Sequence, residues 1–361
     1  MTYRKMMMFN WFKSSKTTPL PAALQQFIQN WILPDSDIAL ASLISQAILI
    51  KNELTLTLAL PLVSIQPVLQ QALIDAGYEV NLILQSDYQA PVVFKQIKQV
   101  ILVASGKGGV GKSTTAVNLA CALALDGAKV GLLDADIYGP SIPTMLGLSG
   151  NKITSPDNKF MQPMFAHGVY LQSIGFLVDA EQASVWRGPM ASKALEQLLN
   201  ETLWPELDYL IVDMPPGTGD IQLTMAQKLP VTGAVVVTTP QDVALADAKK
   251  AISMFRQVKI PLLGLIENMS FYQCDHCGET DDIFGTKGGV ELAERYQVRV
   301  LGQLPLQRNI REQSDLGMPI VLKDQPVAKI YRTISQQLQF TLFQHLEQLQ
   351  TSQTEIIITD D

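Results

Sequence analysis

Residues 100–115 read Val100-Ile101-Leu102-Val103-Ala104-Ser105-Gly106-Lys107-Gly108-Gly109-Val110-Gly111-Lys112-Ser113-Thr114-Thr115. An apolar run rich in branched residues ends at a glycine-rich turn, and an apolar pattern with helical spacing follows from Ala116. A strand, a loop and a helix in this order form the context of a phosphate-binding loop, whose glycines let backbone N–H groups approach phosphate oxygens. The complete spacing Gly-x-x-x-x-Gly-Lys-Ser, from Gly106 to Ser113, therefore predicts a nucleotide-binding site.

The polar groups of this loop have separate expected tasks. Lys112 would reach the terminal phosphates and the Ser113 hydroxyl would bind Mg²⁺, while the helix N-terminus adds positive potential at the same point. The loop residues that we expect to contact ATP are Gly106, Lys107, Gly108, Gly109, Val110, Gly111, Lys112, Ser113 and Thr114.

A second lysine, Lys107, stands early in the loop. The order Lys-Gly-Gly-x-Gly-Lys-Ser resembles the deviant Walker A motif of the MinD, ParA and nitrogenase iron protein class. The resemblance implies that Lys107 reaches across a dimer to the partner's nucleotide. A second cation there would neutralise phosphate charge as the transition state forms, which makes Lys107 a catalytic candidate beside Lys112. The alternative is an ordinary solvated loop charge.

Composition narrows the class of protein. The chain has 361 residues, enough for more than one domain, and its net charge of −7 argues against nonspecific nucleic-acid binding. No apolar run is long enough to span a membrane, and Asn10 and Lys13 interrupt the apolar part of the N-terminal segment, unlike in a signal peptide. Three cysteines cannot make a disulfide framework, so we expect a reducing, cytoplasmic setting. From the charge and the lack of a membrane span, we expect neither nucleic-acid nor membrane partners.

The pattern along the chain indicates two folded domains with tails. We expect a flexible tail over residues 1–19, a small α+β domain over 20–86, a linker over 87–97, a P-loop ATPase domain over 98–350 and an acidic tail over 351–361. Within the small domain, the periodicity predicts helices over 21–32, 38–48 and 68–76, and strands over 54–60 and 78–84.

From residue 98 onward, expected strands and helices alternate, which is typical of an α/β fold with a doubly wound, mostly parallel sheet. The expected strands are 100–104, 129–134, 169–173, 209–213, 233–238, 262–268 and 298–304. The expected helices are 114–125, 192–202, 221–228, 245–256, 289–296 and 327–349.

Three aspartates follow expected strands of this domain. Asp134 and Asp136 end the second strand and Asp213 ends a later one, so all three are expected at the ligand-binding edge of a parallel sheet. Asp213 fits the acid that holds Mg²⁺ through water, and Asp134 the outer shell of the same ion. Asp136 fits the group that orients or activates the attacking water. For each of them, a helix cap or a surface acid is the alternative.

Two further segments are candidates for the same site. Met214-Pro215-Pro216-Gly217-Thr218-Gly219-Asp220 suits a loop that rearranges on hydrolysis, or else a plain turn before a helix. Asn268, at the end of another expected strand, is a candidate for hydrogen bonding the adenine edge of ATP, with a turn-forming asparagine as the alternative.

Cys274 and Cys277 interrupt the alternation of strands and helices. Two thiols at this spacing suit a soft metal or an iron–sulfur cluster, but one chain supplies two ligands where a cluster or zinc usually needs four. A two-fold dimer would bring four thiolates to one interface. Structural zinc, a redox disulfide and an unligated pair are the alternatives, while Cys121 fits a helix core and His276 a solvated loop.

Together these segments resemble the Mrp/ApbC family of iron–sulfur cluster carrier ATPases, from Phe94 to the final helix. The resemblance rests on residues 106–113, 134–141, 186–190, 213–220, 267–270 and 274–277. It implies a homodimer that binds ATP with Mg²⁺, hydrolyses it slowly, and hands a labile 4Fe–4S cluster from its paired cysteines to apo-proteins. The small domain is similar to one related to iron–sulfur assembly factors, although Leu60-Pro61-Leu62-Val63 lacks the cysteine of that domain.

A positioning ATPase of the ParA or MinD type is the main alternative. A membrane-bound version should end in a basic amphipathic helix, whereas Lys329 and Arg332 are the last basic residues here and an acidic tail follows. A DNA-bound version should have a basic surface, which the net charge disfavours. A further alternative is an ATPase whose cysteines hold structural zinc.

Overall fold

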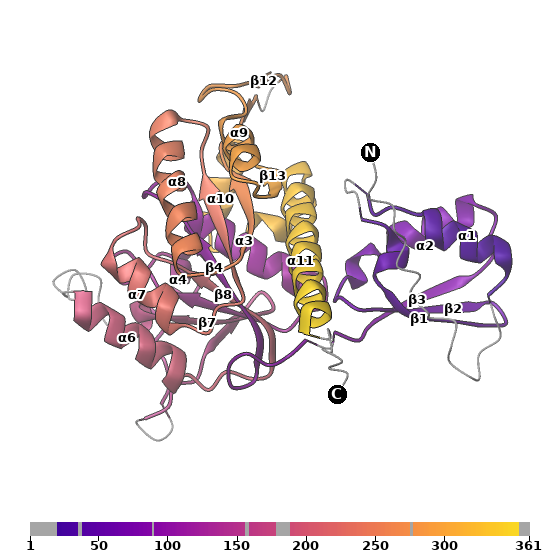
Figure 1. Cartoon of the computed structure of the whole chain (residues 1–361), viewed down its shortest axis with the longest axis horizontal. Coiled ribbons are helices and arrows are strands. Elements are labelled where there is room, and N and C mark those ends of the chain that lie inside the picture. Colours follow the sequence, from indigo (N-terminus) through magenta and orange to yellow (C-terminus); the bar gives the residue numbers. More distant parts are fainter. Residues whose placement is uncertain are drawn as a thin grey trace, which may run out of the picture. The chain divides into compact units, whose positions relative to one another are not determined.

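The computed structural model describes residues 20–34, 38–88, 90–155, 159–177, 188–274 and 277–353. It divides into two compact units, one before residue 90 and one from Ala90 onward (Figure 1). The expected tail over 1–19, most of the acidic tail, and Trp186, Arg187 and His276 lie outside the described residues. None of the described helices has the length and apolar character needed to cross a membrane.

The first unit is a small α+β fold. Its sheet has the order β1-β2-β3, with β1 antiparallel and β3 parallel to the central strand. Leu54, Leu56 and Leu58 of β2 are fully buried and alternate with half-buried or exposed residues, as expected for a strand with one covered face. The elements are α1 (Ala22–Asn30), β1 (Ile44–Ile50), β2 (Glu53–Leu58), α2 (Gln66–Asp75) and β3 (Asn81–Ser86).

The prediction of a helix over residues 38–48 is wrong. Only a short 3-10 turn, Leu40–Ser42, precedes β1, which turns back at Lys51 with a positive φ of 57° and pairs with β2. The apolar spacing of this segment is compatible with either structure, but Ile44, Ile48 and Ile50 are β-branched and favour a strand. The neighbouring strand β2 forms the hydrogen bonds that the backbone of β1 needs, and a window of sequence does not show that this pairing will form.

The second unit is built on one eight-stranded sheet with the order β13-β10-β9-β4-β8-β5-β7-β6. All neighbouring strands are parallel except β6 and β7, so the structure confirms the α/β, doubly wound, mostly parallel fold. The strands are β4 (Ile97–Ala104), β5 (Val130–Asp134), β6 (Met164–Ala166), β7 (Val169–Ser173), β8 (Leu207–Asp213), β9 (Gly233–Thr238), β10 (Leu262–Glu267) and β13 (Val300–Gln303).

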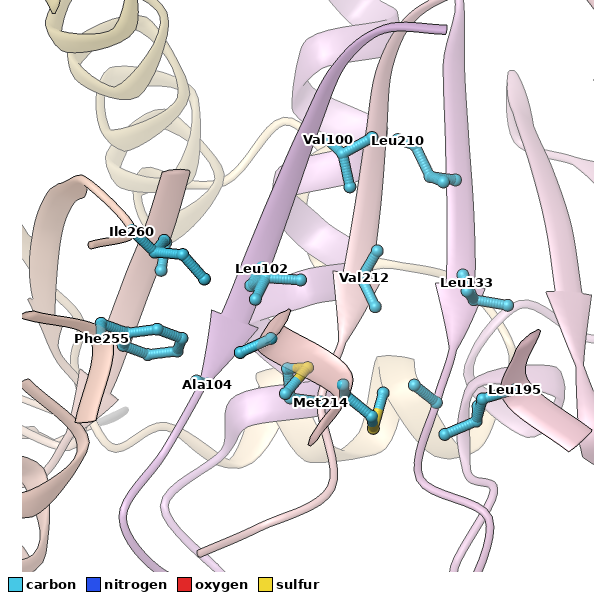
Figure 2. Close-up of a cluster of buried hydrophobic side chains, with 14 of the residues drawn as sticks. Val100, Leu102, Ala104, Leu133, Leu195, Leu210, Val212, Met214, Phe255 and Ile260 are labelled. Atoms are coloured by element: carbon cyan, nitrogen blue, oxygen red, sulfur yellow. The ribbon is translucent and has the colours of Figure 1, made fainter. Parts of the chain in front are cut away.

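Helices cover both faces of this sheet. Val100, Leu102 and Ala104 of β4 point into a buried cluster with Leu195 and Phe255, which come from helices on one face (Figure 2). The residues between them on β4 are equally buried, toward the face where α3 and α11 pack. The helices are α3 (Lys112–Leu125), α4 (Ile142–Met145), α6 (Gly188–Glu201), α7 (Asp220–Lys228), α8 (Asp242–Gln257), α9 (Gly288–Arg295), α10 (Arg308–Asp315) and α11 (Pro326–Gln353).

The seven strands expected in this domain are all present, whereas several short elements were not expected. These are the antiparallel edge strand β6, the helices α4 and α10, and a hairpin formed by β11 (Tyr272–Gln273) and β12 (Thr280–Asp281). Elements of two to eight residues contain too few periods for an apolar repeat to be visible, which explains why they were missed.

Candidate functional site

The phosphate-binding loop lies between β4 and α3, in the middle of the sheet. Gly109 and Gly111 have φ values of 80° and 81°, in the left-handed region that favours glycine. Gly106 is required for a different reason, because a Cβ atom there would lie 2.1 Å from the backbone carbon of Asp247 in α8. The loop therefore combines a backbone turned toward a ligand with close contact to a neighbouring helix.

Lys112 and Asp213 form a buried ion pair at the base of the loop. The Lys112 Nζ lies 2.6 Å from Asp213 Oδ1, with exposed side-chain fractions of 6% and 0%. The same ammonium donates to the Ser113 hydroxyl at 3.2 Å. The lysine expected at the terminal phosphates thus lies beside the aspartate and the hydroxyl that were expected at Mg²⁺.

The second oxygen of Asp213 fits a metal site. Asp213 Oδ2 is buried and has no hydrogen-bond partner among the described residues. A buried carboxylate oxygen without a partner is unfavourable, and a hydrated Mg²⁺ ion would satisfy it. Ser113 and Asp213 together supply the hard oxygen ligands that this ion prefers, so the residues present fit Mg²⁺.

Asp134 lies on the neighbouring strand, level with Asp213 in the parallel register of β5 and β8. It is fully buried, and Asp134 Oδ2 accepts hydrogen bonds from the Ser173 hydroxyl at 3.0 Å and the Ile142 N–H at 3.3 Å. Ser173 was expected only as the end of a strand, although a polar residue at that edge of a parallel sheet is a signal for the site. It holds one oxygen of Asp134 in place.

The three aspartates share an acidic, partly desolvated environment. Burial raises the pKa of Asp134, and the charge of Asp213 raises it further. Burial likewise raises the pKa of Asp213, an effect that Lys112 opposes. Burial raises the pKa of the half-buried Asp136, with Lys112 acting against it and Asp213 acting with it. Cations near this site would therefore favour the charged carboxylates.

Lys107 lies apart from this cluster of charges. Its side chain is half-buried, and no described residue forms a hydrogen bond or an ion pair with its ammonium group. Its backbone carbonyl accepts a hydrogen bond from the Ser105 hydroxyl at 2.9 Å. The structure thus brings Lys112, Ser113 and the three aspartates together, and leaves the Lys107 ammonium available for another ligand.

The segment after Asp213 packs under the phosphate-binding loop. Gly217, with a φ of 100°, donates its N–H to the Ser105 carbonyl at 3.0 Å, and Gln222 Nε2 donates to the Pro216 carbonyl at 2.5 Å. Residues 214–219 therefore form a bonded turn between β8 and α7, next to the base of the phosphate loop.

Asn268 contacts the phosphate loop rather than projecting freely from the sheet. Its Nδ2 donates to the Val110 carbonyl at 2.8 Å, and its backbone N–H donates to the Thr238 carbonyl. The side-chain nitrogen also lies 2.2 Å from where a Cβ on Gly111 would stand, so a side chain at this loop position would displace the Asn268 amide. The side-chain oxygen of Asn268 remains the part suited to the adenine edge.

The two cysteines lie on the β11–β12 hairpin. Cys274 is half-buried and Cys277 is exposed, while the backbone N–H of Cys274 donates to the Glu279 carbonyl and that of Gly278 to the Cys274 carbonyl. Figure 1 shows β12 at one end of this unit, near α9. Within the described residues, no three His, Cys, Asp or Glu side chains gather where they could hold a metal ion. Cys121 is fully buried in α3, and burial raises the pKa of its thiol to about 12.

Comparisons with known proteins cover this part of the chain. The family model described as ParA, NUBPL iron-transfer P-loop NTPase, matches residues 96–339, which include the phosphate loop, the three aspartates, Asn268 and both cysteines. An iron–sulfur cluster carrier protein of Escherichia coli (strain K12) is 59% identical over 249 residues, covering 68% of this chain and 68% of the relative.

Two solved structures are also similar. A nucleotide-binding protein from Archaeoglobus fulgidus, solved in complex with ADP, is 40% identical with a TM-score of 0.55, covering 62% of this chain and 87% of that one. The cell division ATPase MinD from Pyrococcus furiosus shares the fold at 22% identity, with a TM-score of 0.53 and coverage of 66% and 98%.

Proposed function

This chain belongs to the ParA-type family of NUBPL iron-transfer P-loop NTPases, and from that membership we propose that it is an ATP-binding iron–sulfur cluster carrier. In this proposal a homodimer holds a labile 4Fe–4S cluster between its cysteines and hands it to apo iron–sulfur proteins in the cytoplasm. Hydrolysis of ATP is slow and is coupled to binding or release of the cluster.

The observation that carries the proposal is the position of the cysteine pair. Cys274 and Cys277 lie on a hairpin that begins four residues after Asn268, which itself is bonded to the phosphate loop. One thiol is half-buried and the other exposed, as suits ligands for a cargo that must be released. Two thiols per chain become four in a two-fold dimer, which is the number that a 4Fe–4S cluster requires.

The ATPase reaction follows from the residues around the phosphate loop. Water attacks the γ-phosphorus, the bond to the β–γ bridging oxygen breaks, and ADP and phosphate are released. Asp136 orients the water and accepts its proton. We assign this role to Asp136 because it is the least buried of the three aspartates and so the one that water reaches most easily. Lys112 leaves Asp213 for the terminal phosphates, and the phosphate charge that builds up is balanced by this lysine.

The metal and the partner subunit complete the site. Mg²⁺, when bound, would neutralise phosphate charge, and Ser113 and Asp213 would hold it, with Asp134 in its outer shell. Lys107 of the partner subunit would add a second cation, which agrees with its lack of a partner among the described side chains. We therefore propose Lys107, Lys112 and Asp136 as the catalytic residues.

Anaerobic reconstitution of the purified chain tests this function. We expect a brown protein with about two irons and two sulfides per chain, half of a four-iron cluster. A colourless protein with stoichiometric zinc would instead support a structural zinc site. About four irons per chain would contradict a cluster shared between subunits.

A further inference from the structure

Glu267 is a fully buried carboxylate that has no task in the ATPase reaction. It ends β10, directly before Asn268, and none of its surface is exposed. Among the described residues no lysine or arginine forms an ion pair with it. A buried carboxylate is costly unless hydrogen bonds satisfy it, so the partners of Glu267 indicate what this residue holds together.

Those partners come from three separate segments. Glu267 Oε1 accepts hydrogen bonds from the Ser270 hydroxyl at 2.6 Å and from Gln303 Nε2 at 2.7 Å. Glu267 Oε2 accepts a hydrogen bond from the backbone N–H of Gly289, in the first turn of α9. The carboxylate therefore connects the loop that leads to the cysteines, the end of β13 and the start of α9.

Gly289 shows that this contact is closely fitted. A Cβ atom at that position would lie 2.6 Å from Glu267 Oε2 and 3.1 Å from its Cβ. Only glycine lets the first turn of α9 come this close to the carboxylate. The N–H groups of a first helical turn lack partners within the helix, and Glu267 satisfies one of them.

The chain on either side of Glu267 joins the two functional sites. Asn268 is bonded to the phosphate loop at Val110, and Met269 follows in the left-handed region with a φ of 55°. Ser270 then donates its N–H to the Leu304 carbonyl, and Cys274 is four residues further on. Six residues, 268–273, therefore separate Glu267 from Cys274, and the Glu267 side chain bonds Ser270 within them, Gln303 of β13 and Gly289 of α9.

We propose that Glu267 is a positioning residue that couples the nucleotide state of the phosphate loop to the geometry of the cysteine pair. With its three hydrogen bonds in place, residues 267–270 move as one unit when nucleotide displaces Val110 and Asn268. Without them, the hairpin loses its link to the loop. The coupling is reciprocal: bound nucleotide changes the affinity of the cysteine pair for metal by some factor, and metal at the cysteines changes nucleotide affinity by that same factor.

This proposal rests on the proposed function, but its test uses the full-length chain without a cluster. The rates at which iodoacetamide alkylates Cys274 and Cys277 are measured with and without Mg²⁺ and a non-hydrolysable ATP analogue. Cys121, which is fully buried, serves as the unreactive internal thiol. We expect nucleotide to change the alkylation rate of the pair by at least about fivefold, the lower end of usual allosteric coupling.

Glu267→Gln keeps the shape of the side chain but places an amide where only acceptors fit. This variant should bring the ratio of the alkylation rates with and without nucleotide to about one. Its affinity for the analogue should stay within about fivefold of wild type. Asp126→Asn is the matched control, because Asp126 is another buried carboxylate that accepts from a glutamine, Gln339, far along the chain from the hairpin. This control should keep the full ratio.

Ser270→Ala removes one of the three hydrogen bonds and is the milder variant if Glu267→Gln does not fold. It should lower the ratio without abolishing it. The proposal is wrong if wild type binds the analogue and its alkylation rates do not change, or if a folded Glu267→Gln chain keeps the wild-type ratio. The latter result would mean that nucleotide shields the thiols through dimer formation alone. Absence of iron after reconstitution would contradict the carrier function and leave this readout intact.

Discussion

At the residue scale, the ion pair between Lys112 and Asp213 is the buried charge contact of the phosphate site. Both side chains are buried, and in the proposed reaction the pair separates when Lys112 turns to phosphate. Lys112→Ala should abolish hydrolysis and destabilise the nucleotide-free fold by about 3–5 kcal/mol, because it leaves a buried carboxylate without its partner. Adding Asp213→Asn should recover part of that loss. Urea unfolding of the single and double variants measures both effects.

A surface pair provides the control for this experiment. Lys98 lies 2.9 Å from Asp208, but 31% of the lysine side chain is exposed. Lys98→Ala should therefore cost no more than about 1 kcal/mol. If Lys112→Ala and Lys98→Ala unfold at the same urea concentration, the buried pair does not stabilise the fold more than the surface pair does.

Asp136 determines the predicted pH dependence of hydrolysis. Burial raises the pKa of its carboxyl group, and the group must be charged to accept a proton. The kcat/KM of wild type should therefore fall on the acidic side at a pH above the usual aspartate value of about 3.9. Asp136→Asn should bind ATP and lower kcat by about 10²–10⁴-fold, without that acidic limb. Steady-state hydrolysis from pH 4 to 8 checks both points, and an unchanged kcat would remove Asp136 from the reaction.

At the scale of elements, the phosphate loop depends on close contact with α8. A methyl group on Gly106 would overlap the backbone of Asp247, which cannot move aside as a side chain does. Gly106→Ala should lower the free energy of unfolding of the nucleotide-free chain by at least about 1–3 kcal/mol, as overpacking does. Gly108→Ala is the control in the same loop, since a Cβ atom there would lie 3.9 Å from its nearest neighbour, in Pro216. Equal stabilities of the two variants would contradict this account of Gly106.

The hairpin carries the second prediction at this scale. Cys274→Ala leaves at most two thiolates at a site shared by two chains, and Cys277→Ala does the same. Each variant should therefore lose nearly all bound iron, not half of it, because a cluster needs about four ligands. ATP binding should persist, because the phosphate loop belongs to other elements, and its affinity should change by no more than the coupling between the two sites. Iron content and ATP binding are measured side by side, and a Cys277→Ala chain that retains its cluster would refute the bridged arrangement.

At the scale of the whole molecule, we predict a composite nucleotide site in which Lys107 of one chain reaches the nucleotide of the other. Its ammonium has no partner among the described residues of its own chain, and the proposed target is the nucleotide of the partner subunit. Lys107→Ala and Lys112→Ala chains should each be inactive alone. Their mixture should recover part of the wild-type ATPase rate, because each mixed dimer contains one complete site. With subunit exchange confirmed, a mixture that stays inactive at every ratio would place Lys107 in its own chain's site.

The amino-acid sequence determined the class of fold, because long apolar strands and helices repeat with periods that a local window detects. All seven strands expected in the main unit are present, and the deviation in the first unit, β1, arose where the apolar pattern allowed both helix and strand. The residues proposed for phosphate, metal and cysteine chemistry were also apparent from local motifs, since each motif is contained within a few neighbouring positions.

Tertiary structure alone decided how those motifs meet. The Lys112–Asp213 pair joins residues 101 positions apart, Asp134 is held by Ser173 from another strand, and Asn268 is bonded to Val110 across the sheet edge. The role that we propose for Glu267 rests on contacts to Gly289 and Gln303 that no spacing in the sequence suggests. The physical reason is that hydrogen bonds and burial depend on distance in space, which the order of strands in the sheet sets and local periodicity does not contain.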